Sequence, residues 1–458
     1  MVRYQNTINT NISWIPQIPN HWNLMKVNAL FQERKCKVSD KVFSPLSVTK
    51  KGILPQLEHA AKTNNGDNRK LVKAGDFVIN SRSDRKSSCG VSQLDGSVSL
   101  INIVLTPREE LNGKYIHYLL RNYRFSEEYY RNGRGIVADL WTTRYSEMKS
   151  ILLPVPPRTE QDQIVRFLDW KVSEINKLIG IKLKRILNIR DYEKQVINEK
   201  VLNGLHSSDL KYSGNKWIGC IPDNWKIIPL GKFCSFQNGI SESGDFFTSG
   251  TPFVGYGDVY RHIELPIKVN GKAQANKKQQ ELFSVQKDDI FFTRTSENLE
   301  EIGMAAVCSH TIDKAVFSGF LIRCRQKEKY VIANYMKYYL QIPAVRNHFS
   351  SNVNIVIRAS LSQNLLKTLP IVIPPENEQR EIASYLDLKH TEFEKVIEIT
   401  TKEIEELNEL KNTLISDVVT GKIDVRNIEI PAYEHVEDVV GDGEENEEEL
   451  ADAEETEV

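Results

Sequence analysis

The sequence lacks the cysteine and histidine spacings that usually indicate a metal site or a disulfide framework. None of the six cysteines belongs to a Cys-x-x-Cys pair, and no two of the nine histidines are four residues apart. We therefore expect no zinc ribbon, no disulfide-stabilised scaffold and no His-x-x-x-His metal site. Reduced thiols are expected instead, as in a cytoplasmic protein, because the cytosol keeps thiols reduced.

Long apolar segments are also absent. No stretch approaches 18 uninterrupted apolar residues, and the first 20 residues contain no apolar signal-peptide segment. A membrane-spanning helix needs about 20 predominantly apolar residues, and a signal peptide needs its own apolar core. We therefore predict no signal peptide, no membrane span and no membrane partner.

Catalytic motifs are missing as well. The chain has no Gly-x-x-x-x-Gly-Lys-Ser/Thr loop for ATP phosphates and no Asn/Asp-Pro-Pro-Tyr/Phe motif of amino-methyltransferases. Pro222 and Asp223 could begin a nuclease motif, but no Glu-x-Lys follows within about thirty residues, and the Gly-Tyr-Gly at 255–257 is too short for a cofactor fingerprint. We predict no catalytic residue, no bound metal and no cofactor in this chain.

The composition is that of a folded protein, with 40% hydrophobic and 26% charged residues. A length of 458 residues allows two or three domains at about 150 residues each. The charge is unevenly distributed. Residues 434–458 hold 13 acidic and no basic side chains, whereas the net charge is +10 over 1–157 and +6 over 208–375. Two basic segments favour a polyanionic partner such as nucleic acid.

Two motifs each occur twice. The first, Trp-Ile-x-x-Ile-Pro-x-x-Trp, spans 14–22 and recurs 203 residues later. The second, Pro-Pro-x-x-Glu-Gln-x-x-Ile, spans 156–164 and recurs 218 residues later. The chain is therefore a tandem duplication whose two interiors differ in length. We expect the tryptophans to pack onto the two domains and the prolines to form the turn into a helix.

A heptad pattern follows each Pro-Pro pair. Residues recur at steps of three and four along 168–196, where Lys182 and Glu193 are polar interruptions, and along 393–418. This period predicts two long helices that pair along a coiled-coil seam. Helical bundles and oligomerisation modules show the same period, and the period leaves the relative direction of the helices open.

The two basic segments combine strand and helix patterns. Each is expected to be one mixed α/β domain, because short apolar runs typical of buried strands are followed by amphipathic helical segments. The predicted strands are 76–79 and 289–292, the predicted helices are 114–120 and 334–340, the predicted N-caps of the long helices are Thr159 and Asn377, and their predicted C-terminal caps are Gly204 and Gly421.

Basic residues among hydroxyl and amide side chains are the candidate DNA contacts. Arginine and lysine bind phosphates or guanine acceptors, and asparagine and glutamine can pair with adenine. Any one of these residues can equally be solvated surface, and only their collection in two basic segments favours nucleic-acid binding. The predicted DNA-binding residues are Arg82, Arg85, Lys86, Arg134, Lys277, Lys278, Arg294 and Arg358.

The two duplicated motifs, in this order around two variable segments, resemble the specificity (S) subunits of type I restriction-modification systems. The resemblance implies two target-recognition domains in tandem pseudo-repeat, separated by two long conserved helices that pair as an antiparallel coiled coil. The expected boundaries are 1–157 for the first domain, 158–207 for the first helix and a linker, 208–375 for the second domain, 376–426 for the second helix and 427–458 for an acidic disordered tail.

The resemblance also implies a function and partners. Each domain would read one half of an asymmetric bipartite site on double-stranded DNA, and the helices would set the spacer and dock two methyltransferase subunits. Those subunits would bring S-adenosylmethionine and adenine-N6 methylation, and motor-nuclease subunits would bring ATP-driven translocation and cleavage. Three alternatives stay open: a coiled-coil scaffold that binds only protein, an enzyme with an unrecognised site such as a stand-alone methyltransferase, and the specificity subunit of another multisubunit restriction system.

Overall fold

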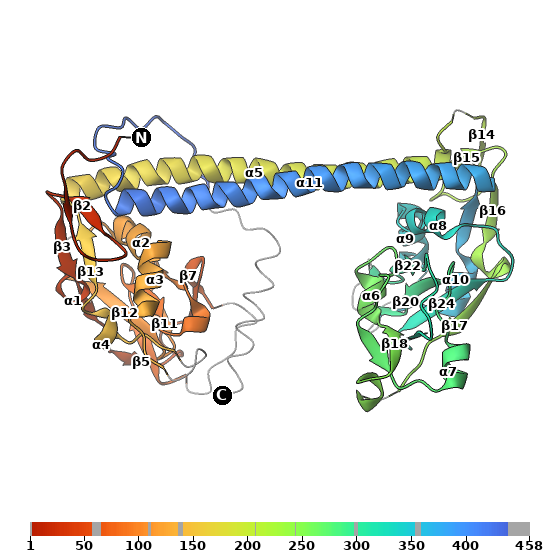
Figure 1. Cartoon of the computed structure of the whole chain (residues 1–458), viewed down its shortest axis with the longest axis horizontal. Coiled ribbons are helices and arrows are strands. Elements are labelled where there is room, and N and C mark those ends of the chain that lie inside the picture. The colour runs from red at the N-terminus through yellow and green to blue at the C-terminus, as the bar shows by residue number, and fades with distance from the viewer. Residues whose placement is uncertain are drawn as a thin grey trace. The chain divides into compact units, whose positions relative to one another are not determined.

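The computed structural model of the chain describes residues 2–56, 66–108, 111–135, 141–206, 208–242, 244–296, 301–352 and 359–437. Contacts divide the chain into two units, which are described separately. Unit 1 comprises Met1–Arg185 and Thr400–Val458, and unit 2 comprises Ile186–Ile399 (Figure 1). Among the described helices, none has the length and apolar character that a membrane span requires.

Unit 1 contains a mixed α/β domain. Its main sheet is antiparallel, and all four residues of β9 are buried, which confirms the predicted strand. In order, this sheet consists of β10 (Cys89–Val91), β9 (Phe77–Asn80), β12 (Asn102–Pro107) and β4 (Phe31–Glu33), and a second sheet consists of β11 (Gly96–Val98), β8 (Arg69–Val72) and β5 (Lys37–Val38). Two amphipathic helices, α2 (Gly113–Arg121) and α3 (Tyr123–Arg131), bury their apolar faces in the same domain, and α2 is the helix predicted at 114–120.

Unit 2 contains a second mixed α/β domain of related design. The predicted strand at 289–292 appears as the buried β20, and the predicted helix at 334–340 appears as α8 (Ala333–Tyr339). A further helix, α9 (Pro343–Ser350), follows α8. The main antiparallel sheet consists of β17 (Cys234–Asn238), β24 (Leu321–Gln326), β20 (Ile290–Thr293) and β22 (Ala305–Val307), and the second sheet consists of β19 (Gly271–Ala273), β18 (Thr251–Val254) and β23 (Val316–Phe317).

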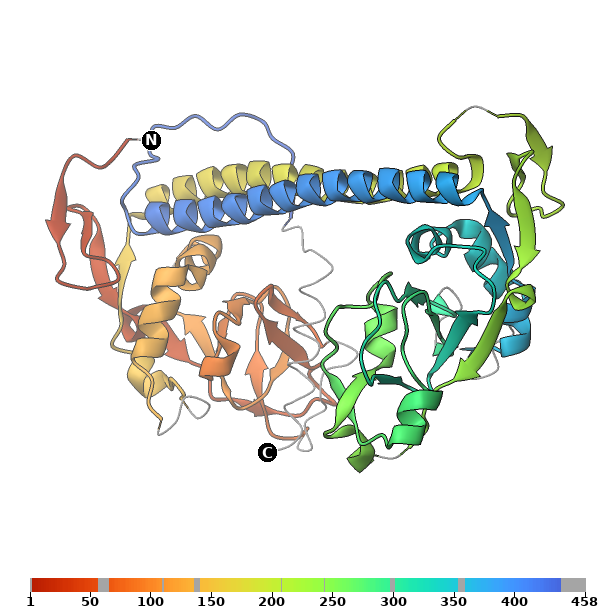
Figure 2. The ribbon, with the colours of Figure 1, turned by 45° about the vertical axis from the view of Figure 1, so that its right-hand side comes forward.

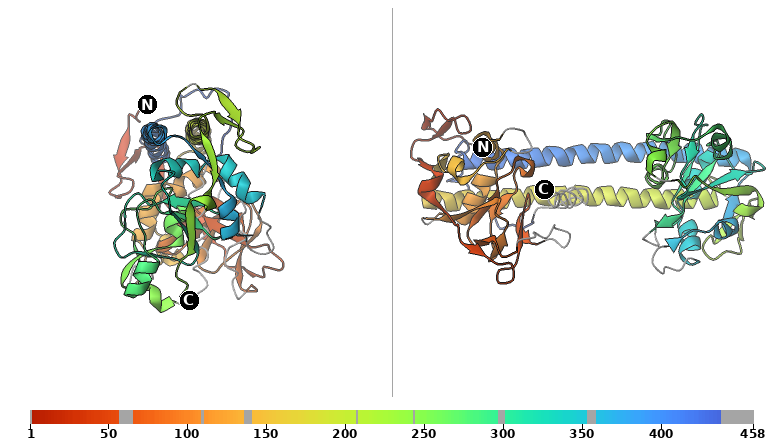
Figure 3. Two further views of the ribbon diagram at one scale, coloured as in Figure 1. Left: turned by 90° about the vertical axis from the view of Figure 1, so that its right-hand side faces the viewer. Right: turned by 90° about the horizontal axis from the view of Figure 1, so that it is seen from below.

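Two long helices, α5 (Arg158–Asn203) and α11 (Glu376–Val419), confirm the heptad prediction. Both begin directly after their Pro-Pro pair, so Thr159 and Asn377 lie inside the first turn and the predicted caps are wrong. Within each unit the helices lie side by side (Figures 2 and 3). They run antiparallel, because later residues of α5 contact earlier residues of α11. The pairs are Asn176 with Lys411 and Lys182 with Glu403 in unit 1, and Tyr192 with Phe393 and Glu193 with His390 in unit 2.

The duplicated motifs contact each other in the same way in both units. The indole N–H of Trp22 donates to Glu160 at 3.1 Å, and that of Trp225 donates to Glu378 at 2.9 Å. The glutamate of the second motif therefore holds the last tryptophan of the first motif. Trp217 departs from the predicted packing, because its side chain is exposed with Lys216 over its ring.

Buried tyrosines connect each domain to the C-terminal end of a long helix. The Tyr115 hydroxyl of α2 lies 3.4 Å from the Val419 carbonyl of α11, and the Tyr335 hydroxyl of α8 lies 3.2 Å from the Val201 carbonyl of α5. Burial raises the pKa of both phenols well above the usual range. Both phenols therefore remain neutral hydrogen-bond donors.

The predicted glycine caps are confirmed. Gly204 and Gly421 have φ of 76° and 75°, in the left-handed region where glycine is favoured. Each glycine also lies against the first motif. A Cβ atom on Gly421 would lie 2.3 Å from Pro19, and one on Gly204 would lie 3.1 Å from Trp225. The end of α11 is therefore tied to the start of the chain, as the end of α5 is tied to the second copy of the motif.

A buried carboxylate precedes the central strand of each domain. Asp76 accepts a hydrogen bond from Arg34 Nε at 2.7 Å, and Asp289 accepts one from Arg325 Nε at 2.6 Å. Each carboxylate also accepts a backbone N–H from three residues earlier, at 2.8 and 2.7 Å. An arginine therefore balances the charge of each buried carboxylate. Because both units contain this ion pair, it is part of the repeated scaffold.

Part of the segment after α11 lies along α5 in unit 1. The Gln163 side chain donates to the Ile428 carbonyl at 2.8 Å, and that of Asn176 donates to the Val436 carbonyl at 3.1 Å. The sequence predicts a disordered tail from 427 onward, but Ile428 and Val436 of that segment make these contacts with α5. The remainder, 438–458, lies outside the described residues.

Candidate nucleic-acid interface

Four of the predicted DNA-binding residues lie on adjoining segments of unit 1. Arg82, Arg85 and Lys86 follow β9, at a single turn of 3-10 helix named η1 (Ser83–Arg85). The backbone of Thr142 forms isolated β-bridges with both Arg82 and Arg134. The turn after β9 and the segment after α3 are therefore brought together, although about fifty residues separate them in the sequence.

Tyr130 contacts the turn that carries this cluster. Its hydroxyl donates to the Arg85 carbonyl at 3.1 Å, and burial raises its pKa, so the phenol remains a neutral donor. The Lys86 ammonium lies 5.9 Å from the centre of the Tyr130 ring and 6.0 Å from that of Tyr123. Lys86 also forms an ion pair with Glu127. The lysine is thus positioned by two rings and one carboxylate.

Two arginines of the cluster, Arg82 and Arg134, form ion pairs with nearby carboxylates. The Arg134 side chain is 85% exposed, and its Nε lies 3.9 Å from Glu147. A hydrogen bond from Ser146 lowers the pKa of Glu147, which therefore stays ionised. Arg82 pairs with Asp84 at 2.9 Å, and both side chains are partly exposed. An exposed pair such as Arg82–Asp84 is worth roughly 0–1 kcal/mol, so it holds the arginine only weakly.

Arg294 is the predicted contact best defined in unit 2. It lies between β20 and β21 (Thr295–Ser296). Its N–H donates to the Phe320 carbonyl at 2.8 Å, and its own carbonyl accepts a hydrogen bond from the Leu361 N–H at 2.8 Å. These two backbone bonds fix the arginine at the end of the central strand, the place that Arg82 occupies after β9.

The other predicted contacts of unit 2 lie elsewhere. Lys277 and Lys278 are exposed in the first turn of α7 (Lys277–Leu282), which the Asn276 side chain caps. Among the described residues, no hydrogen bond or ion pair joins Arg294 to either lysine. Arg358 lies outside the described residues.

The sequence of the second half matches a known family. Residues 222–409 match the model described as the type I restriction modification DNA specificity domain. In this half the chain is therefore similar to type I specificity subunits. The tryptophan–glutamate hydrogen bond of that half recurs in unit 1.

The chain is also similar to two proteins of Methanocaldococcus jannaschii. The chain is 24% identical over 340 residues to a protein provisionally named the type I restriction enzyme MjaX specificity subunit, and the match covers 71% of each chain. It is 23% identical over 292 residues to the type I restriction enzyme MjaVIII specificity subunit, covering 61% of this chain and 64% of that one. A solved structure on complex assembly and conformational transition of the type I R-M system has the same fold. Its TM-score is 0.61 at 15% identity, with 89% of this chain and 99% of that chain covered.

Two exposed aromatic residues near the basic cluster and Arg294 were not singled out from the sequence. Tyr123 is 67% exposed beside Lys86, and Phe320 is 61% exposed beside Arg294. Aromatic side chains in such positions can stack on bases or wedge between base steps. The neighbouring basic residues lie 37 and 26 positions away in the sequence, so no local pattern could have linked the pairs.

The long helices of this chain also carry exposed apolar side chains. Exposed apolar side chains on a helix are candidates for contact with a protein partner. These residues are Leu178, Ile181 and Leu410 in unit 1, and Leu187, Tyr192, Leu388 and Ile399 in unit 2.

Proposed function

We propose that this chain is the specificity subunit that recognises DNA sequence in a type I restriction-modification complex and that each domain reads one half of an asymmetric bipartite site. The duplicated scaffold is the observation that carries this proposal. The pairs Trp22–Glu160 and Trp225–Glu378 attach two domains to the helix pair by the same contacts, while the interiors of the domains differ. Two similar but non-identical readers suit two different half-sites.

The proposed DNA contacts follow from the chemistry of the side chains. An arginine can bind the O6 and N7 acceptors of guanine bidentately, and lysines neutralise phosphates. Tyr123 and Phe320 would supply stacking or a wedge beside these cations. The basic residues we assign to DNA are Arg82, Arg85, Lys86 and Arg134 for one half-site, and Lys277, Lys278, Arg294 and Arg358 for the other.

We propose that the helices α5 and α11 set the spacer and dock two methyltransferase subunits. The exposed apolar residues on both helices support a protein partner there. In this proposal the chain itself catalyses nothing. The methyltransferase subunits supply S-adenosylmethionine and adenine-N6 methylation, and motor-nuclease subunits supply ATP-driven translocation and cleavage.

Genome-wide mapping of N6-methyladenine tests the proposal. Cells that contain the methyltransferase partner are compared with and without this gene. We expect a split motif that disappears when the gene is removed, and the motif gives both half-sites at once. Unchanged methylation, in cells where the chain co-purifies with methyltransferase subunits, would contradict the proposal.

A charge-reversal variant tests the cluster in unit 1. We expect the double substitution Arg82→Glu and Arg85→Glu to abolish recognition of one half-site. If both arginines contact phosphates, the slope of log affinity against log salt for the purified complex falls by about 2. The matched control reverses the exposed Lys26 and Lys149 of the same unit, which should leave recognition intact. A scaffold that binds only protein would show no salt-sensitive DNA affinity at all.

A further inference from the structure

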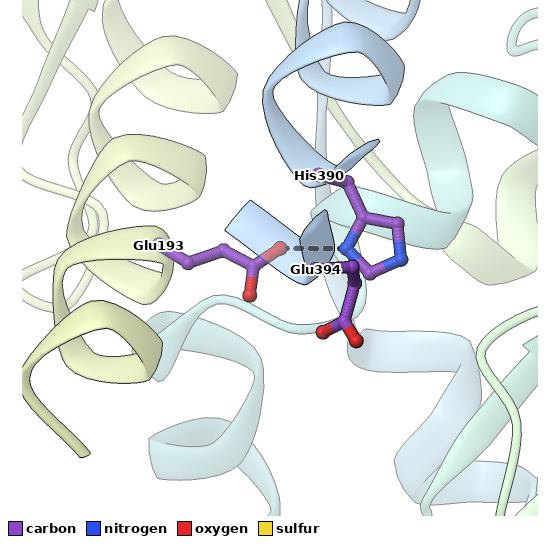
Figure 4. Close-up of side chains that lie close together, drawn as sticks. All are labelled: Glu193, His390 and Glu394. Atoms are coloured by element: carbon purple, nitrogen blue, oxygen red, sulfur yellow. Dashed lines mark hydrogen bonds and ion pairs between the residues drawn. The ribbon is translucent and has the colours of Figure 1, made fainter. Parts of the chain in front are cut away.

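Three potential metal ligands meet on the helix pair of unit 2. Glu193 of α5 and His390 and Glu394 of α11 each offer a ligand atom, and these atoms all lie within 4.8 Å of one another. Glu193 Oε1 lies 2.7 Å from His390 Nδ1. Figure 4 shows the glutamate pointing from α5 toward the two side chains of α11. Because His390 and Glu394 are four residues apart on one helix, they share a face.

The corresponding position in unit 1 has different chemistry. The repeat offset of 218 residues relates His390 to Val172, Glu394 to Asn176 and Lys411 to Glu193. There the Lys411 ammonium donates to the Asn176 side-chain oxygen at 3.2 Å. Equivalent positions on the two long helices therefore carry a cation and an amide in unit 1, and an imidazole and two carboxylates in unit 2. Because the helices pair in unit 1 without an imidazole and two carboxylates, the pairing of the helices does not require these groups in unit 2.

We propose that Glu193, His390 and Glu394 bind a divalent first-row transition-metal ion that ties α5 to α11 in unit 2. An imidazole with two carboxylates suits Zn²⁺, Co²⁺ or Ni²⁺, whereas Mg²⁺ and Ca²⁺ prefer oxygen ligands alone. Three protein ligands leave a fourth position for water. Two carboxylates also balance the charge of the ion.

The burial of the ligands supports this assignment. The Glu193 side chain is only 14% exposed, although it occupies a seam position where an apolar residue is expected, while His390 is 45% exposed. Burying a carboxylate at such a position costs free energy unless a cation balances its charge. The partly open histidine gives the ion a path from solvent.

Co²⁺ titration of the full-length chain tests the site. The exposed Cys36 and Cys220 also bind soft metals, so both are first replaced by serine, and the protein is treated with a chelator. We expect one equivalent of Co²⁺ to bind with the visible absorption of a nitrogen and oxygen site and without sulfur-to-metal charge transfer. Zn²⁺ should displace it.

The unit 1 residues provide a matched control that keeps the helix pairing. In the triple variant Glu193→Lys, His390→Val and Glu394→Asn, unit 2 receives the set that unit 1 already uses. We expect this variant to fold, as judged by circular dichroism, and to lose the bound equivalent. In addition, Zn²⁺ should slow hydrogen exchange in the α5 and α11 peptides around residues 193 and 390 of the parent protein only.

Two outcomes would overturn the proposal. One is that the parent protein binds no more Co²⁺ than the triple variant, in which case Glu193 and His390 form only an ion pair. The other is that bound metal leaves the exchange of both helix peptides unchanged. Neither outcome touches DNA recognition, which is measured separately by methylation mapping.

Discussion

Lengthening both long helices by equal amounts should change the spacer of the recognised DNA. The chain passes from unit 1 to unit 2 between Arg185 and Ile186 of α5 and returns between Ile399 and Thr400 of α11. A heptad inserted at both points preserves the seam, because a coiled coil repeats every seven residues. Duplicating 179–185 and 400–406 supplies this heptad from the chain's own sequence and repeats the pairing of Lys182 with Glu403.

The size of the change follows from helix geometry. Seven residues at ~1.5 Å each add ~10 Å, which corresponds to ~3 base pairs at ~3.4 Å per base pair. Three base pairs also rotate one half-site by ~100° about the DNA axis, since one turn takes ~10.5 base pairs. Three heptads add ~31 Å, or ~9 base pairs, which nearly completes a turn. The three-heptad variant should therefore recognise DNA better than the one-heptad variant.

Methylation mapping measures both variants. We expect the three-heptad protein to methylate the same two half-sites with a spacer longer by ~9 base pairs, and the one-heptad protein to methylate weakly. Inserting a heptad into α5 alone is the control, and it should reduce stability because the two seams no longer match. A three-heptad protein that keeps the original spacing would refute the ruler function of the helices.

Three further predictions concern single residues. Phe320→Ala should weaken DNA binding by about 1–3 kcal/mol if the ring stacks on a base, whereas Phe320→Tyr should bind normally in a fluorescence-anisotropy assay. Leu388→Glu should reduce co-purification of the methyltransferase subunits, and a reversal of the exposed polar Glu381 on the same helix should not. Arg325→Met should destabilise unit 2 by about 3–5 kcal/mol, because it leaves the buried Asp289 carboxylate unpaired. Urea unfolding measures this loss, and adding Asp289→Asn should recover part of it.

Local sequence patterns were sufficient to predict the scaffold. The heptad pattern predicted α5 and α11 because their seams extend over many turns. Gly204 and Gly421 predicted the ends of these helices because a left-handed backbone conformation favours glycine. The N-terminal caps were predicted wrongly. Each helix begins at the residue directly after its Pro-Pro pair, so Thr159 and Asn377 are the second residues of their helices and not the N-caps.

Contacts between distant residues could not be predicted in this way. The bond from Trp22 to Glu160 joins residues 138 positions apart. The approach of Gly421 to Pro19 joins the end of α11 to the first copy of the tryptophan motif. The same limit applies to the candidate DNA site. The cluster in unit 1 exists because Thr142 bridges Arg82 and Arg134, a pairing that has no local signal.

The two copies differ most where the scaffold does not constrain them. Glu160 and Glu378 must both accept an indole N–H, and Gly204 and Gly421 must both leave room for the first motif, because these contacts attach a domain to a helix end. The turns that carry Arg82 and Arg294 take no part in that attachment. Under the proposed function, substitution there should change which DNA a domain binds without loosening the domain from the helices. If the proposal holds, a duplicated chain built in this way can change one half-site at a time, because each proposed recognition surface is separate from the contacts that hold its domain in place.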